Sequence, residues 1–215
     1  MKILNLFRKE LKLPDGSFVI EGVPFFSQRV DDANYKQEGF SSLKEAVYWS
    51  ERICGIACVK MVVKAFMPEK DVRLNDLLDR GLEAVAYRED VGWIHQGLID
   101  LARLFGLNGG RKSVGENIEK IGEYVINHKV VIASVTVGFE AGKEYKKEDG
   151  SYYKMQKGGH LVVVFGVEVE NGKVKNLLLH HPSSWQSYEW HHHKISREDF
   201  LGSFSKKGNI IYLGR

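Results

Sequence analysis

The sequence has few cysteines and no long hydrophobic run, and both absences narrow the possibilities. Two cysteines among 215 residues are too few for the disulfide framework of a small secreted domain. No stretch approaches the roughly 18 apolar residues that a membrane span needs. The apolar patch at the start is broken by Arg8, Lys9 and Glu10, which makes a poor signal peptide. We therefore expect a cytoplasmic protein without a membrane span, or a secreted one if a leader has been trimmed away.

An excess of charge of one sign is also lacking. The 31 lysines and arginines nearly balance the 28 aspartates and glutamates, so that the formal net charge is only +3. No basic run carries interleaved aromatic residues in a nucleic-acid-binding pattern. This composition argues against a nucleic-acid partner. With 43% hydrophobic residues, the chain has ordinary globular composition, and we expect one domain over residues 1–215.

Hydrophobic periodicity predicts helices first and a sheet second, which favours an α+β fold over alternating α/β units. A polar segment between two strands, 138–159, is expected to form a surface flap whose hairpin tip is the Asp149-Gly150 step. In residue numbers, the predicted helices are 54–66, 92–107 and 115–129, and the predicted strands are 130–137, 160–170, 173–181 and 209–214.

Cys54 lies at the head of the apolar helix "CGIACVKMVVKAF". Backbone N–H groups and the helix dipole favour an anion there, so that a thiol in this position tends towards the reactive thiolate. Gly55 lets another group approach the backbone closely. The alternative is a small buried core residue, which is the usual state of a free cysteine. Cys58 lies one turn further on and is interpreted as core.

A nucleophilic cysteine needs a base, and His160 is the best-placed histidine because it opens a strand after two glycines. The turn at Asn171-Gly172 predicts a two-residue hairpin between this strand and the next. With residue 170 opposite 173, residue 162 faces His181. His160 and His181 then share one face as diagonal neighbours, about 7 Å apart at Cβ. A base and the group that orients it would be arranged in this way.

Four segments in order carry a resemblance to a known family. They are "VPFFSQ", "CGIACVKMVV", "GGHLVVVFGVEVENGKVKNLLLHHPSS" and "ISREDFLGSFSKKGNIIYL". From Val23 to Leu213 the chain resembles the peptidase C39-like branch of the papain-like cysteine peptidases, and "GWIHQGLIDLARLFGL" resembles its bacterial members. The resemblance implies a papain-like fold, with N-terminal helices packed on an antiparallel sheet. It also implies thiol-protease activity, that is, hydrolysis of a peptide or another amide.

The family's functional positions map onto this sequence residue by residue. Cys54 matches the nucleophile, His160 the base, and Gln28 the glutamine that helps to bind the oxyanion. His181 stands where the family usually has an aspartate before proline. A neutral histidine can orient His160 through a hydrogen bond but cannot offset its positive charge. Other groups that could take this role are Ser183, Glu189 and Asp199.

Two alternatives remain beside the peptidase. Fold does not fix function, so the chain could be a catalytically silent papain-like module that binds peptides. Alternatively, Cys54, His160 and His181 could hold zinc or copper, with a further ligand from the histidines at 191–193. The spacing is unlike that of a dedicated structural zinc site, and we expect no metal and no cofactor.

Overall fold

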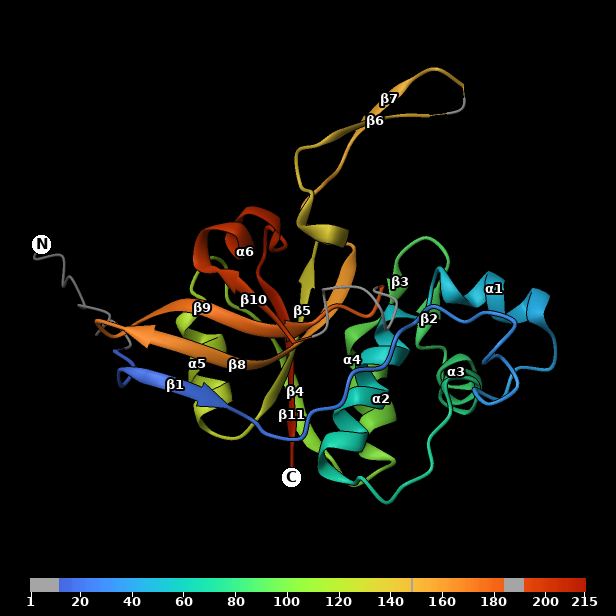
Figure 1. Ribbon diagram of the computed structural model, residues 1–215, viewed down its shortest axis with the longest axis horizontal. Coiled ribbons are helices and arrows are strands. Elements are labelled where there is room, and N and C mark those ends of the chain that lie inside the picture. The colour runs from blue at the N-terminus through green and yellow to red at the C-terminus, as the bar shows by residue number, and fades with distance from the viewer. Residues whose placement is uncertain (1–11, 148, 184–191) are drawn as a thin grey trace, which may run out of the picture.

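The computed structural model describes residues 12–147, 149–183 and 192–215. Its centre is a seven-stranded sheet (Figure 1). Six strands follow the order β10-β9-β8-β5-β11-β4, and the seventh, β1, pairs with β8. Every pairing in this sheet is antiparallel. The strands are β1 (Gly16–Val19), β4 (Asn108–Ser113), β5 (Val130–Val135), β8 (His160–Glu170), β9 (Lys173–His180), β10 (His193–Ser196) and β11 (Asn209–Gly214).

Six helices lie in the described part of the chain, together with two small hairpins. The hairpins pair β2 (Tyr87–Arg88) with β3 (Gly92–Trp93), and β6 (Glu144–Lys146) with β7 (Tyr152–Lys154). The helices are α1 (Leu43–Ser50), α2 (Cys54–Phe66), α3 (Leu74–Glu83), α4 (His95–Arg103), α5 (Glu119–Ile126) and α6 (Arg197–Ser203). None of these helices is long and apolar enough to cross a membrane.

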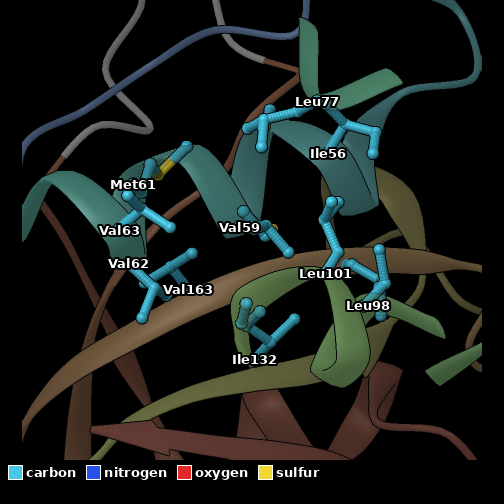
Figure 2. Close-up of a cluster of buried hydrophobic side chains, with 14 of the residues drawn as sticks. Ile56, Val59, Met61, Val62, Val63, Leu77, Leu98, Leu101, Ile132 and Val163 are labelled. Carbon is cyan, nitrogen blue, oxygen red and sulfur yellow. The ribbon is translucent and has the colours of Figure 1, made fainter. Parts of the chain in front are cut away.

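Side chains from the two faces of the sheet enter two separate hydrophobic clusters. On one face α2 and α4 cover the sheet and α3 packs against these two helices. Figure 2 shows Val59 of α2 and Leu101 of α4 with Ile132 of β5 and Val163 of β8. On the other face α5 and α6 pack against Val131, Val162 and their neighbours. The odd and even residues of a strand thus serve different clusters, as the period of two requires.

The predicted fold class, an α+β fold with helices packed on an antiparallel sheet, is confirmed. The expected order of helices before strands was wrong in two places, because β1 precedes every helix and β4 lies between α4 and α5. β4 has the sequence NGGRKS and pairs only with β11, at the edge of the sheet. An edge strand without apolar alternation gives no periodic signal. The single-domain organisation stays a prediction.

The predicted flap is the β6–β7 hairpin, which projects away from the body of the molecule in Figure 1. Its strands are in register at Tyr145 and Tyr153. At the tip, the Asp149 carboxylate accepts a hydrogen bond from the Ser151 backbone N–H at 2.9 Å, and Gly150 has a φ of 84°. The polar sequence therefore folds as a hairpin with little burial.

A buried ion pair fixes the loop that precedes α1. Lys60 of α2 is buried, although the sequence places it off the apolar stripe, and its Nζ lies 2.6 Å from the Glu38 carboxylate. The same carboxylate accepts a hydrogen bond from the backbone N–H of Leu74 at 2.9 Å, at the start of α3. Glu38 therefore joins the loop to two helices.

We expect Glu38→Gln to lower the free energy of unfolding by about 2–3 kcal/mol. The amide still accepts from Leu74, but it leaves the Lys60 ammonium buried without a counter-charge, and breaking a fully buried pair costs about 3–5 kcal/mol. The 20% exposure of the Glu38 side chain reduces that figure. Urea unfolding measures the effect, and adding Lys60→Met should restore most of the stability. Equal stability of Glu38→Gln and the wild type would show that the pair contributes nothing.

Candidate active site

Cys54 is the first residue of α2, as predicted, and it is partly buried. Three backbone N–H groups, those of Leu161, Gly55 and Cys54 itself, act on the thiol and lower its pKa. Leu161 directly follows His160 at the start of β8. The structure therefore brings the head of α2 against the residue next to the predicted base, although the two lie more than a hundred positions apart.

The expected tendency of Cys54 towards thiolate was wrong. Burial raises the pKa of the Cys54 thiol to about 11, because loss of solvation outweighs the three N–H groups. The pKa of Cys58 is raised well above its usual value for the same reason. Cys58 is fully buried in the cluster between α2 and the sheet, which confirms its interpretation as core.

Trp93 is the residue that approaches the backbone closely at Gly55. A Cβ atom at position 55 would lie 2.8 Å from the Trp93 ring, and the ring's Nε1 donates a hydrogen bond to the Arg52 carbonyl at 2.8 Å. The glycine therefore packs the tryptophan against the first turn of α2. It positions the turn that carries Cys54.

His160 opens β8, as predicted, and is buried. The two preceding glycines, Gly158 and Gly159, have φ values of 90° and 91°, a region that favours glycine. The Nε2 atom of His160 is buried and has no hydrogen-bond partner among the residues that the structure describes. Burial lowers the pKa of His160 well below its usual value, with smaller contributions in the same direction from His181 and then Arg29. The ring is therefore a neutral imidazole at neutral pH.

The hairpin register that places His181 was predicted correctly near the site. Residues 170 and 173 are paired, and so are 163 and 180, which leaves 162 opposite 181. An irregularity between residues 168 and 169 shifts the register by one residue. A second irregularity, between residues 164 and 166, restores it. Because the two bulges compensate for each other, the side chains at the site lie on the same face of the sheet as in an uninterrupted hairpin.

His160 and His181 lie together, but their rings stack face to face. The ring centroids are 4.5 Å apart and the ring planes differ by 25°. The Nε2 atom of His181 accepts a hydrogen bond from the Gly138 N–H at 3.0 Å, at the root of the flap. Burial lowers the pKa of His181 to about 4, so that this nitrogen stays an acceptor at neutral pH. His181 thus contacts His160 through its face instead of through the expected orienting hydrogen bond.

Gln28 is buried beside the chain that leaves β9. Its backbone N–H donates to the Pro182 carbonyl at 2.7 Å, and its side-chain Oε1 accepts from the Ser183 hydroxyl at 3.4 Å. Its side-chain Nε2 donates to the Ser50 carbonyl at 2.7 Å. An amide nitrogen has two hydrogens, and within the described part of the chain the second N–H of Gln28 has no acceptor, so it remains for a ligand. Despite the long insertion between Gln28 and Cys54, the Gln28 side chain therefore binds a residue that lies just before α2.

Arg29 was missed by the sequence analysis, which treated residues 29–50 only as a charged insert. Its Nε donates to the Ser183 carbonyl at 3.3 Å, and its guanidinium pairs with Glu51. It lowers the pKa of both site histidines. Its position directly after Gln28 was a signal that could have found it.

The other candidates for the third role lie elsewhere. Ser183 donates to Gln28, and Asp199 binds the Ser196 hydroxyl at the start of α6. Glu189 and His191 fall outside the described residues. Within the described ranges 12–147, 149–183 and 192–215, no three His, Cys, Asp or Glu side chains gather as metal ligands would.

Comparison with known proteins gives a result at the level of the fold. No family model and no curated protein matches the chain. A crystal structure of a candidate C39-like peptidase from Bacillus anthracis matches with a TM-score of 0.55 and 16% identity, over 94% of this chain and 99% of that one. The chain therefore has the fold of a C39-like peptidase, as the sequence predicted.

Two further solved structures are less similar. The peptidase domain of Streptococcus ComA, a bifunctional ABC transporter involved in quorum sensing, has a TM-score of 0.48 and 15% identity, over 76% of this chain and 92% of that one. A double-glycine-motif protease from an AMS/PCAT transporter, in complex with its leader peptide, has a TM-score of 0.45 and 18% identity, over 75% and 84% of the two chains.

Proposed function

We propose that the protein is a cysteine hydrolase that acts on a peptide or another amide bond. The observation that carries the proposal is the proximity of the Cys54 thiol to the Leu161 N–H, because it brings a helix-terminal cysteine next to a strand-opening histidine. Cys54 is the nucleophile, His160 the base, Gln28 an oxyanion donor and His181 the group that supports His160. These residue types are the nucleophile, the base and the supporting group that nucleophilic hydrolases use.

The shifted pKa values favour attack from a neutral pair. Burial raises the pKa of Cys54 to about 11 and lowers the pKa of His160 well below its usual value, so that a resting thiolate–imidazolium pair is disfavoured. His160 therefore takes the thiol proton as the sulfur forms its bond to the carbonyl carbon. The second N–H of Gln28 and the Cys54 backbone N–H bind the negative oxygen that develops.

The remaining steps follow from the same groups. The imidazolium of His160 gives its proton to the leaving amine as the C–N bond breaks, which leaves an acyl group on Cys54. Water, with one proton taken by His160, then attacks the thioester carbon. The C–S bond breaks, the acid is released, and the Cys54 sulfur regains its proton from His160. The cytoplasmic location expected from the sequence stays a prediction.

A catalytically silent, peptide-binding module is the second candidate. The neutral thiol and the absence of a carboxylate at position 181 favour it, because both weaken the nucleophile. Such a module binds a peptide on the same surface, but the peptide forms no covalent bond to Cys54. The two candidates therefore differ in whether an acyl group is ever found on the sulfur.

The test is to trap that acyl group. The wild-type protein is incubated with a library of octapeptides, quenched in acid and analysed by mass spectrometry, with cleaved peptides read from the same sample. A peptidase gives new peptide termini and a thioester adduct on Cys54. Peptides that bind but stay intact, with an unmodified Cys54 at every time point, would overturn the hydrolase and support the silent module.

A further inference from the structure

A cavity of about 590 Å³ adjoins the candidate active site. Ser50 and Ser183 line it, and both bind the Gln28 side chain. Arg29, which follows Gln28, lines it as well. A group in this cavity would therefore lie directly beside the predicted oxyanion donor.

One wall of the cavity is apolar and belongs largely to α1. Leu43 and Val47 are one helical turn apart and so project from the same face of the helix. Both line the cavity and both are exposed, at 38% and 50% of their surface, while Val30 adds a buried apolar side chain. This wall suits an aliphatic chain.

The charged groups of the cavity are predominantly acidic. Asp31, Asp32 and Glu51 stand against Arg29, which leaves a formal charge of −2. Arg29 pairs with Glu51, so the excess belongs to the two aspartates. Across the described ranges of the chain, neither Asp31 nor Asp32 has an ion-pair partner.

We propose that this cavity is a specificity pocket for a lysine or arginine side chain of the peptide substrate. The aliphatic stem lies on Val30, Leu43 and Val47, and the cationic end meets Asp31 and Asp32. Such side chains bury their methylenes while keeping the charge at a polar rim. An acidic side chain meets like charge here. The proposal rests on the proposed function only in taking a peptide as the ligand.

The experiment measures binding and cleavage separately. Octapeptide pools carry Lys, Arg, norleucine or Glu at each position in turn. Binding is measured with the Cys54→Ala protein by competition against a fluorescent pool member, and cleavage with the wild type. At one position we expect Lys and Arg to bind about three- to tenfold better than norleucine, since exposed ion pairs contribute modestly, with Glu weakest. The preference should fall in high salt.

Two variants and a control assign the effect to the cavity. The double variant Asp31→Asn and Asp32→Asn should remove the preference for Lys over norleucine, while keeping the turn in which Asp31 accepts from the Ala33 N–H. Val47→Ser should weaken both ligands. Asp71→Asn, an exposed aspartate away from the cavity, should change neither.

The possible results test the proposed specificity pocket and the proposed hydrolase activity independently. Binding with a Lys preference that Asp31→Asn and Asp32→Asn abolish, but without cleavage, supports the pocket and overturns the peptidase. Cleavage without preference for Lys or Arg at any position overturns the pocket and leaves the peptidase standing. A preference that survives in the double variant also overturns the pocket.

Discussion

Cys54→Ala should lower kcat/KM for cleavage of the best library peptide by a factor on the order of a thousand or more. Loss of a nucleophile removes the covalent route and leaves only binding and oxyanion stabilisation. The neutral resting pair does not weaken this expectation, because the thiol loses its proton during attack in the proposed mechanism. Mass-spectrometric rates over a series of enzyme concentrations measure the loss.

Cys58→Ala is the matched control, because both cysteines lie in α2 one turn apart. Cys58 packs in the core and has no role in the reaction, so its replacement should reduce stability while leaving kcat/KM within a few fold. Circular dichroism and the unfolding midpoint confirm that each variant is folded. Comparable cleavage by the wild type and Cys54→Ala would assign the activity to a different nucleophile.

The first and last residues of the most strongly periodic segments could be predicted from the sequence. The helix 54–66 and the strands 160–170 and 209–214 have their predicted bounds, since each combines apolar periodicity with glycine or polar residues at its ends. The diagonal placement of His160 and His181 was also predicted correctly. The prediction holds only because two bulges cancel, and no local sequence pattern reveals those bulges.

Other features depend on tertiary contacts that no local pattern contains. The helix α1 was missed because its face at Leu43 and Val47 is exposed, so the apolar stripe is short. The burial of Lys60 depends on Glu38, which lies 22 positions away. Helix-terminal position alone predicted a thiolate at Cys54, but burial between α2 and β8 reverses the direction of its pKa shift. Desolvation is set by packing, which sequence spacing does not give.

His181→Asp should speed alkylation of Cys54 by iodoacetamide at pH 7 about ten- to hundredfold. A carboxylate beside His160 favours the imidazolium and raises the pKa of His160 by roughly 1–3 units, whereas a neutral His181 supplies no negative charge and a protonated one lowers that pKa. A higher His160 pKa increases the population of the thiolate–imidazolium pair in proportion. In the wild type, with Cys54 at about 11, the rate should rise about tenfold per pH unit from 7 to 10 without a plateau.

His181→Asn is the matched control, because it has the shape of aspartate but carries no charge. It should leave the alkylation profile close to that of the wild type, whereas His181→Asp should gain a plateau below pH 8, where the ion pair supplies the thiolate. The peptide that carries Cys54 is followed by mass spectrometry, with the buried Cys58 as a slow internal reference. Superimposable profiles for aspartate and asparagine would show that position 181 exerts no charge effect on His160, and the role of His181 as its supporting group would be wrong.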